Sequence, residues 1–391
     1  MDEIILGLAS ISAIAWIALL GFWGQFWRGT PQMETLTHQS LNLAPENYPK
    51  VCVIIPARNE AEVLPRTLRS LVDRDYPGST TILAIDDGST DDTAAIAKSF
   101  VGVTVIAGEP LPSGWTGKLW AMEQGVRYSQ TQQLLPDYYL FTDADIQHPV
   151  SNITQLVQKA EAEDLELVSL MVKLNCTSFW ERLLIPAFIF FFQKLYPFPW
   201  VNNPQKAIAA AAGGCILIRR AALDRIGGLD GLRHALIDDC TLAQAVKSTG
   251  AGRIWLGLSQ STISLRSYTT LQPIWDMVAR TAFTQLNYSP LLLLGTLLGM
   301  ILVYLMPPLS IAWGSLRGEP AIAIVGALTW GLMAIAYAPT ARLYDRSPFA
   351  GLQLPSIATL YTLMTVDSAL RHWQGRGGAW KGRVYPKVEE K

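Results

Sequence analysis

The sequence predicts an α/β fold, a mixed and mostly parallel sheet flanked by helices, with hydrophobic membrane helices at both ends of the chain. Short apolar runs alternate with helix-like stretches between residues 51 and 145, which is the pattern of a parallel sheet with helical crossovers. Uncharged runs about as long as a bilayer is thick precede and follow the middle of the chain. Together these observations predict one globular domain attached to a membrane.

Four strands are predicted in the alternating region, at residues 51–55, 81–85, 103–106 and 138–142. Residues 60–71 have apolar side chains at helical spacing, and residues 90–100 begin with acids, which suit a helix N-terminus. Right-handed crossovers place the carboxyl ends of parallel strands along one edge of the sheet. The polar residues that follow these strands are therefore expected to converge.

The strand pattern fades after residue 170, and residues 179–200 become aromatic and apolar. Pro186, Pro197 and Pro199 interrupt the helical periodicity of this segment, which makes it too broken to cross a membrane. Two interpretations stay open: a helix that lies on the membrane surface, and a core helix of the domain.

Four membrane-associated segments are predicted. Residues 4–23 lack charge and form an anchor, because the run is too long for a cleaved signal peptide and lacks its basic leader. Residues 291–313 and 321–339 are predicted to form a hairpin of two membrane helices. Residues 349–366 are interpreted as interfacial or re-entrant, because a proline lies within the segment and an acid follows it.

Basic residues beside these segments predict their orientation. Arg28 follows the first segment, and Arg342 and Arg346 follow the third, which places the middle of the chain on the cytoplasmic side of the cell membrane. The predicted organisation is an anchor, a cytoplasmic domain, a C-terminal membrane region and a basic cytoplasmic tail, at residues 1–27, 28–287, 288–370 and 371–391. The net charge of −1 provides no basic excess for nucleic acid, and the four scattered cysteines are expected to stay reduced.

Asp143 and Asp145 follow the predicted strand at residues 138–142, where ligands usually bind in α/β sheets. Two carboxylates at such a place favour Mg²⁺ or Mn²⁺, which prefers oxygen ligands and can hold a diphosphate as it becomes a leaving group. His148 lies three residues further on and is either a third metal ligand or an ordinary loop histidine.

Asp86 and Asp87 follow the second predicted strand and precede a glycine turn and a helix. Carboxylates at this place can accept hydrogen bonds from the uracil imide and the ribose hydroxyls of a nucleotide. Arg58 and Glu60, in the segment that begins at Pro56, either pair with each other or bracket the same nucleotide.

Lys118 follows a glycine turn and opens a predicted helix, which suits a phosphate group, although a solvated lysine is the alternative. The phosphate-loop pattern of ATPases is incomplete here. Asp238 and Asp239 begin another predicted helix, and they either supply a base that deprotonates an acceptor hydroxyl or cap the helix. Arg280 is either a second cation for a leaving diphosphate or an interfacial anchor.

Taken together and in this order, six segments resemble the family 2 glycosyltransferases. They are residues 56–60, 86–89, 117–118, 143–145, Gly213 and Gly214 followed by Arg219 and Arg220, and residues 238–239. The resemblance covers about residues 50–285. The single N-terminal span, the hydrophobic C-terminal region and the tail resemble the hopene-associated glycosyltransferases and, more distantly, the ceramide glucosyltransferases.

This resemblance implies a GT-A fold, a nucleotide-sugar donor, a divalent metal ion and inversion at the anomeric carbon. Asp87 would contact the base or the ribose, Asp145 with Asp143 would bind the metal, and Asp239 would be the general base. The Gln-x-x-Arg-Trp motif of processive polysaccharide synthases is absent, since the comparable residues 279–283 read Ala-Arg-Thr-Ala-Phe. That departure weakens a role in polymer extrusion.

The sequence thus predicts a membrane-bound glycosyltransferase that moves one sugar from a UDP-sugar to a lipid hydroxyl, with Lys118 and Arg280 stabilising the leaving diphosphate. The resemblance suggests a hopanoid-related lipid. One alternative is a polyprenyl-phosphate sugar transferase, whose phosphate nucleophile needs no general base. Another is a membrane scaffold that keeps the fold without catalysis.

Overall fold

The computed structural model describes residues 1–35, 45–250, 252–376, 379–380 and 383–384. Across these residues the chain forms two compact units. The helical unit comprises Met1–Gly29, Cys176–Pro199 and the described part of Ser267–Lys387. The sheet unit comprises the described parts of Thr30–Asn175 and Trp200–Arg266.

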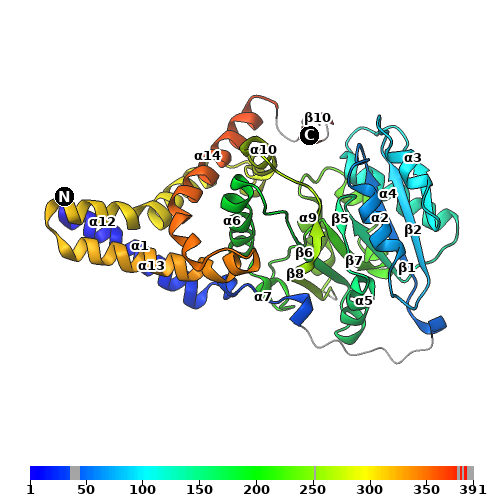
Figure 1. Cartoon of the computed structure of the whole chain (residues 1–391), viewed down its shortest axis with the longest axis horizontal. Coiled ribbons are helices and arrows are strands. Elements are labelled where there is room, and N and C mark those ends of the chain that lie inside the picture. Colours follow the sequence, from blue (N-terminus) through cyan, green and yellow to red (C-terminus); the bar gives the residue numbers. More distant parts are fainter. Residues whose placement is uncertain (36–44, 251, 377–378, 381–382, 385–391) are drawn as a thin grey trace. The chain divides into compact units, whose positions relative to one another are not determined.

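An eight-stranded sheet forms the centre of the sheet unit, in the order β3-β2-β1-β4-β7-β6-β8-β5 (Figure 1). The strands are β1 (Val51–Ala57), β2 (Thr80–Asp86), β3 (Val103–Ala107), β4 (Tyr138–Thr142), β5 (Ile146–Gln147), β6 (Leu167–Lys173), β7 (Cys215–Arg219) and β8 (Ile254–Ser264). Neighbours among β3, β2, β1 and β4 are parallel, as are β6 and β8. The predicted fold class and the four predicted strands are confirmed.

The expectation that the strand pattern ends after residue 170 is wrong, because β7 and β8 follow it. Strand β7 consists of four buried apolar residues followed by Arg219, and such a short apolar run cannot be told from a helix segment by its periodicity. Strand β8 contains the polar stretch Ser259, Gln260 and Ser261, which obscures its alternation. The Glu34 carboxylate accepts hydrogen bonds from all three of these residues, so the polar stretch is satisfied within the sheet unit.

Helices cover both faces of the sheet. They are α2 (Leu64–Val72), α3 (Thr93–Lys98), α4 (Gly117–Thr131), α5 (Asn152–Ala162), α8 (Arg220–Arg225) and α9 (Asp238–Ser248). Because side chains alternate along a strand, Val53 and Ile55 of β1 join Leu68 of α2 in the main core, whereas Ile54 points to the other face. There Gly125 of α4 lies so close to Ile54 that an added Cβ would come within 2.7 Å of it.

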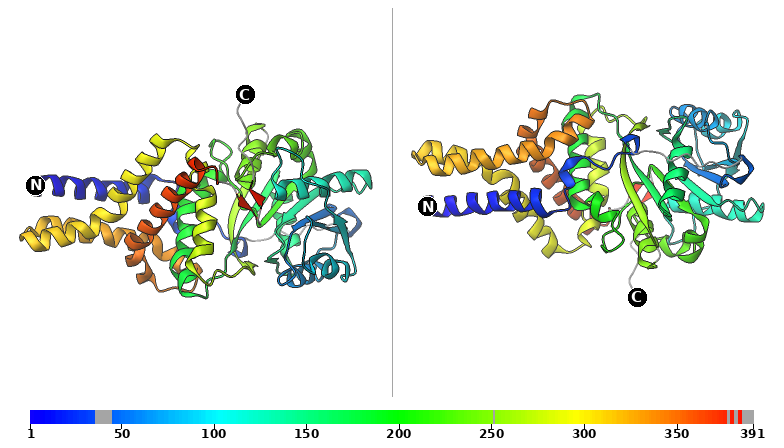
Figure 2. Two further views of the ribbon diagram at one scale, coloured as in Figure 1. Left: turned by 90° about the horizontal axis from the view of Figure 1, so that it is seen from above. Right: turned by 90° about the horizontal axis from the view of Figure 1, so that it is seen from below.

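The helical unit consists almost entirely of α-helices. They are α1 (Asp2–Phe22), α6 (Phe179–Leu195), α10 (Leu271–Thr281), α11 (Pro290–Met300), α12 (Met306–Arg317), α13 (Pro320–Leu343) and α14 (Leu354–Trp373), with a π-helical segment at Ile301–Leu305 and a 3₁₀ segment at Pro348–Gln353. Helices α1, α12 and α13 run alongside one another, as the two views of Figure 2 also show. Two short strands, β9 (Ala379–Trp380) and β10 (Arg383–Val384), pair near the end of the chain.

Among the residues that the structure describes, four helices are long and apolar enough to cross a membrane. They are Asp2–Phe22, Pro290–Arg317, Pro320–Leu343 and Pro348–Trp373, and the first three contain the predicted anchor and hairpin. In the fourth, Pro355 lies in the first turn of α14, where its missing N–H costs nothing. Asp367 accepts hydrogen bonds from Trp275 and Arg371. The interfacial or re-entrant arrangement of residues 349–366 stays a prediction.

The segment at residues 179–200 is less interrupted than its prolines suggest. Helix α6 continues through Pro186 and ends at Leu195, before the next proline. Its rings Phe190 and Phe191 contact Tyr337 of α13 and Tyr361 of α14, which places the helix among the helices of its own unit.

Glycines allow α12 and α13 to approach closely. A Cβ added at Gly326 would lie 2.6 Å from the Pro307 carbonyl oxygen and 2.9 Å from Ser310 Cβ. Gly331, on the same helix, has open space around its Cβ position. Gly326 is therefore needed for the close contact between the two helices, whereas Gly331 of the same helix is not.

We expect Gly326→Ala to destabilise the helical unit by about 1–3 kcal/mol, because the backbone of α12 must move away. Gly331→Ala should leave stability unchanged or raise it slightly, since alanine favours the helix. Thermal unfolding in detergent would measure both, and equal midpoints for the two variants would contradict this account of the packing.

Candidate functional site

The sheet brings five polar segments to one edge. Strands β1, β2 and β4 are parallel and end at Ala57, Asp86 and Thr142, so the predicted segments after them lie side by side. Strand β7 is antiparallel to β4, with Cys215 opposite Thr142, which brings the preceding residues Gly213 and Gly214 to the same edge. Strand β8 runs parallel to β6 and antiparallel to β5, and it ends at this edge shortly before Arg266.

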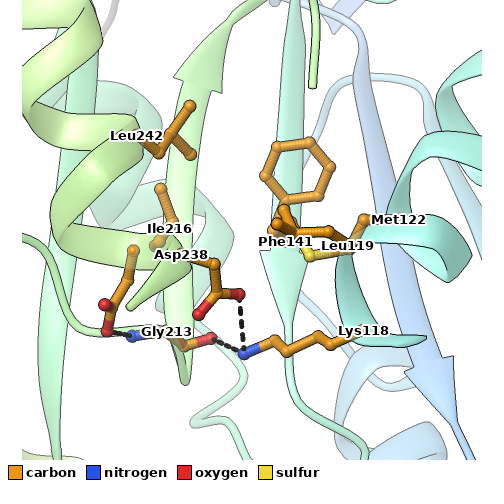
Figure 3. A pocket seen from close by; sticks show the side chains of 9 residues that line it. Lys118, Leu119, Met122, Phe141, Gly213, Ile216, Asp238 and Leu242 are labelled. Carbon is orange, nitrogen blue, oxygen red and sulfur yellow. Dashed lines mark hydrogen bonds and ion pairs between the residues drawn. The ribbon is translucent and has the colours of Figure 1, made fainter. Parts of the chain in front are cut away.

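Lys118 links the predicted metal ligand Asp143 to the acids of α9, and Figure 3 shows its contacts with Asp238 and Gly213. Its Nζ lies 2.7 Å from Asp143 Oδ1 and 3.7 Å from Asp238 Oδ2, and it donates to the Gly213 carbonyl oxygen at 3.4 Å. Burial lowers the pKa of Lys118, but the Asp143 carboxylate outweighs this effect, and the net pKa is raised. The ammonium therefore stays charged and holds β4, α9 and the start of β7 together.

Asp239 lies in the first turn of α9 with both carboxylate oxygens engaged. The backbone N–H of Gly213 donates to Oδ2 at 2.8 Å, and that of Cys240 donates to Oδ1 at 2.7 Å. Burial and the neighbouring Asp238 carboxylate nevertheless raise the pKa of Asp239 to about 6. Asp239 thus accepts one N–H from the first turn of its own helix and also has the proton affinity of a base that works near neutral pH.

Gly213 permits this arrangement because it has no side chain. A Cβ at this position would lie 2.9 Å from Lys118 Nζ and 3.4 Å from Asp239 Oδ2. A side chain at this position would therefore crowd Asp239, which accepts the Gly213 N–H, and Lys118, which donates to the Gly213 carbonyl.

Arg266 bridges two acids from different strand ends. Its Nε lies 2.8 Å from Asp145 Oδ2, and its Nη2 lies 2.8 Å from Glu60 Oε1. The backbone of Leu265 also donates to the Asp145 carbonyl, which fixes the two segments against each other. Burial and the Asp143 carboxylate raise the pKa of Asp145, although Arg266 opposes that rise.

Arg58 lies over the turn that follows β2. Its Nη1 donates to the carbonyl oxygens of Asp87 and Gly88 and lies 3.9 Å from the buried Asp87 carboxylate. Asp86 Oδ1 accepts a hydrogen bond from the Ser89 N–H, which closes the turn. Pro56 is buried inside β1 at a level where β1 pairs only with β2, so its missing N–H breaks no ladder on the β4 side.

His148 is a buried structural residue. Its Nδ1 lies 2.9 Å from the Asn152 side-chain amide, and its Nε2 lies 3.0 Å from Thr142 Oγ1, which also donates to the Gly214 carbonyl. Both ring nitrogens are thus engaged, and burial lowers the pKa of His148 to about 3. Of the two interpretations, these contacts favour the ordinary loop histidine, and its hydrogen bonds link the end of β4 to the start of β7.

An apolar pocket lies behind the acids. It has an empty volume of about 250 Å³, which includes space open to solvent, and Figure 3 shows Lys118 and Asp238 at its polar end. Its other walls are apolar side chains from α4, β4, β7 and α9, namely Leu119, Met122, Phe141, Ile216 and Leu242. This apolar lining accounts for the desolvation of Asp239.

The acids fit a divalent metal ion only in combination with a ligand. In the part of the chain that the structure describes, no three His, Cys, Asp or Glu side chains are grouped to hold a metal ion by themselves. Asp143 and Asp145 are close enough for one carboxylate to raise the pKa of the other. Two carboxylates at a sheet edge match Mg²⁺, which commonly takes one or two carboxylates together with substrate phosphates and water.

Two residues of this site were not predicted as functional from the sequence, Gly213 as a hydrogen-bonding position and Arg266. Arg266 follows β8, a strand that the sequence pattern did not reveal. The polar residues at the end of β8 were the signal that could have pointed to a site there. Arg280 lies on α10 in the helical unit with an exposed side chain, and its role stays a prediction.

Comparisons with known proteins agree with the fold. Residues 52–227 match the family model of glycosyl transferase family 2, which supports a domain of that family in this part of the chain. Two 4,4'-diaponeurosporenoate glycosyltransferases, from Staphylococcus aureus strains RF122 / ET3-1 and MRSA252, are each 33% identical over 100 residues, which is 26% of this chain. The match spans only 25% of the length of those relatives.

The mannosyltransferase PcManGT from Pyrobaculum calidifontis, solved in complex with GDP-Man and Mn²⁺, has a similar structure. It has a TM-score of 0.54 and 17% sequence identity, over 95% of this chain and 99% of that protein. This likeness shows a shared fold, and the predicted GT-A architecture is confirmed.

We expect the contribution of His148 to stability to be lost as the pH decreases from about 6.5. The unfolded chain binds a proton at His148 near the ordinary histidine pKa of 6.5, whereas the folded chain does so only near 3, so this contribution is fully present above 6.5. It falls by about 1.4 kcal/mol per pH unit between these values. Asp239, whose pKa is raised to about 6, acts in the opposite direction below pH 6, so the His148 contribution is the difference between the unmodified protein and a His148 variant.

Thermal unfolding between pH 7.5 and 5 would measure this loss. The variant His148→Asn should be less stable at pH 7.5, and below pH 6.5 its free energy of unfolding should fall by about 1.4 kcal/mol less per pH unit than that of the unmodified protein. The control His234→Asn removes an exposed imidazole and should keep the slope of the unmodified protein. An unchanged slope in His148→Asn would contradict the prediction.

Proposed function

We propose that this chain is a membrane-bound inverting glycosyltransferase that transfers one sugar from a nucleotide-sugar donor to a lipid acceptor at the cytoplasmic surface of the cell membrane. The observation that carries this proposal is the position of Lys118 between Asp143 and Asp238. It supports a single site, since the ammonium contacts one proposed metal ligand, Asp143, and Asp238, the neighbour of the proposed base Asp239.

Asp143 and Asp145 would hold a divalent cation, Mg²⁺ or Mn²⁺. When bound, this ion would supply positive charge to the diphosphate that leaves with the donor nucleotide. Lys118 would add a fixed positive charge on the same side, because its ammonium stays protonated between its acidic neighbours.

Asp239 would act as the general base. Its carboxylate would take the proton of the acceptor hydroxyl while the new bond forms at the anomeric carbon and the bond to the diphosphate breaks. A single displacement of this kind inverts the configuration at that carbon. The N–H of Gly213 holds Asp239 Oδ2 at 2.8 Å and would orient the carboxylate toward the site.

Asp86, Asp87 and Arg58 would bind the nucleotide part of the donor. The Asp87 carboxylate is buried at the end of β2 beneath Arg58, where it would face the base or the ribose. We propose UDP as this nucleotide, since carboxylates can accept hydrogen bonds from the uracil imide. GDP is the comparison to include, because the structurally similar mannosyltransferase was solved with GDP-Man.

The proposed acceptor is a lipid. Four apolar helices could hold the enzyme at a membrane, and the staphylococcal relatives act, by name, on the lipid-like 4,4'-diaponeurosporenoate. A hopanoid-related lipid is the first acceptor to test, on the basis of the sequence resemblance. Incubation of the purified protein with labelled nucleotide sugars and membrane lipids, followed by mass analysis of labelled lipid, tests the proposal directly.

We expect Asp239→Asn to lower kcat by about 10²-fold or more, because the amide cannot accept the proton. Metal-dependent nucleotide binding should persist in this variant. Asp145→Asn should abolish both transfer and metal-dependent nucleotide binding.

The control Asp224→Asn changes an exposed acid that pairs with Arg220 on α8 and should behave like the unmodified protein. Calorimetry with UDP, with and without Mn²⁺, separates binding from catalysis. Near-normal transfer by Asp239→Asn would reject the general base and favour a phosphate acceptor such as a polyprenyl phosphate. No metal-dependent binding by the unmodified protein would favour a non-catalytic scaffold.

We expect kcat/KM to rise with pH up to about 6 and to level off above it, since Asp239 must be ionised and its pKa is raised to about 6. In Asp238→Asn the rise should move to lower pH, because the Asp238 charge contributes to that raised pKa. Nucleotide binding measured over the same pH range accounts for changes at the metal site. An unshifted rise in Asp238→Asn would contradict the assignment.

A further inference from the structure

Each of the two proposed metal ligands contacts a basic side chain of the protein itself. Asp143 lies 2.7 Å from Lys118 Nζ, and Asp145 lies 2.8 Å from Arg266 Nε. The Asp145 side chain is only 8% exposed, whereas that of Arg266 is 36% exposed at the edge of the sheet. The guanidinium can therefore reach solvent, but the carboxylate that it neutralises cannot.

A metal ion and Arg266 would compete for the same carboxylate. Both are cations, and a hard divalent ion needs the carboxylate charge of Asp145, whose Oδ2 the guanidinium now contacts. Glu60 provides a second anchor for Arg266, since its Oε1 lies 2.8 Å from Nη2, a different nitrogen from the Nε that contacts Asp145. Arg266 could thus leave Asp145 without leaving the edge of the sheet.

The acids of this edge leave room for further positive charge. Glu60, Asp143, Asp145 and Asp238 carry four formal negative charges, against two positive charges on Lys118 and Arg266, which pair with them. A divalent ion would neutralise this excess, so the edge would no longer repel a diphosphate. Metal and diphosphate would each favour the binding of the other.

We propose that Arg266 is a counter-ion that neutralises Asp145 before the metal ion binds and then turns, anchored by Glu60, to contact the diphosphate of the donor. This inference rests on the proposed function, because it requires a metal ion and a nucleotide diphosphate at this edge. Arg266 is suited to both roles, since its planar fork matches carboxylate and phosphate groups equally well. It couples the two ligands: the metal ion binds weakly alone and tightly together with the diphosphate.

Binding of Mn²⁺ to the full-length protein in detergent, with and without UDP, tests this coupling. Free Mn²⁺ measured by electron paramagnetic resonance gives the Kd in each case. In Arg266→Gln we expect Mn²⁺ alone to bind roughly tenfold more tightly, because no cation has to be displaced. UDP should lower the Kd for Mn²⁺ in both proteins. In Arg266→Gln the factor by which it does so should be at least about tenfold smaller than in the unmodified protein, because the diphosphate loses a partner.

Arg225→Gln is the matched control. Arg225 has a similarly exposed side chain, 38%, and pairs with Glu166, so its loss breaks one comparable ion pair within the same unit. This variant should keep both the Kd for Mn²⁺ and the effect of UDP. Arg266→Lys keeps the positive charge but not the planar guanidinium, so it should lose part of the coupling between Mn²⁺ and UDP. This variant replaces Arg266→Gln if the glutamine variant does not fold.

The possible outcomes separate the two proposals. Weaker binding of Mn²⁺ alone in Arg266→Gln, or an unchanged effect of UDP in both Arg266 variants, would overturn the counter-ion role. If the unmodified protein binds no Mn²⁺ either with or without UDP, the proposed function itself fails. A purely structural role of Arg266 would lower the unfolding midpoint and weaken both binding steps together, which would also overturn the inference.

Discussion

Lys118 Nζ contacts Asp143, Asp238 and the Gly213 carbonyl, so one half-buried ammonium joins segments that are far apart in the sequence. Without this charge, several carboxylates would face one another across an apolar pocket, and their mutual repulsion would separate β4 from α9. The arrangement also explains the chemistry proposed for Asp239. The positive charge of Lys118 favours the ionised form of this carboxylate, whereas burial and the Asp238 charge disfavour it. The net result is a pKa raised to about 6.

The order of the strands makes this contact possible. Strand β7 runs antiparallel between β4 and β6, so the chain enters it at the same edge at which β4 ends. Gly213 therefore lies beside Asp143 and offers its backbone N–H to Asp239 and its carbonyl to Lys118. The buried His148 network secures the same junction from below, through Thr142 and the Gly214 carbonyl. The charged groups around Lys118 thus lie next to uncharged side chains whose polar atoms are hydrogen-bonded.

The helical unit has a polar cluster of its own. Asp367 of α14 accepts a hydrogen bond from Trp275 of α10 and pairs with Arg371, while Arg371 also contacts Asp276. An acid that would be costly in lipid is in this way satisfied by protein groups. Helix α10, which carries Arg280, is held firmly to α14 by these contacts. This cluster favours a defined position for α10 within its unit.

The sequence by itself determined the parallel half of the sheet, the apolar helices and the acids after β2 and β4, because these depend on local periodicity and on the rule that parallel strands end at one edge. It did not determine β7 and β8, whose patterns are too short or too polar to recognise. Only the tertiary structure decided that Lys118 pairs with Asp143, that Arg266 bridges Asp145 and Glu60, and that His148 is structural. Those choices depend on which side chains the fold brings together at the edge of the sheet, from the start of a helix and from the loops after several strands, and spacing along the chain does not encode such contacts.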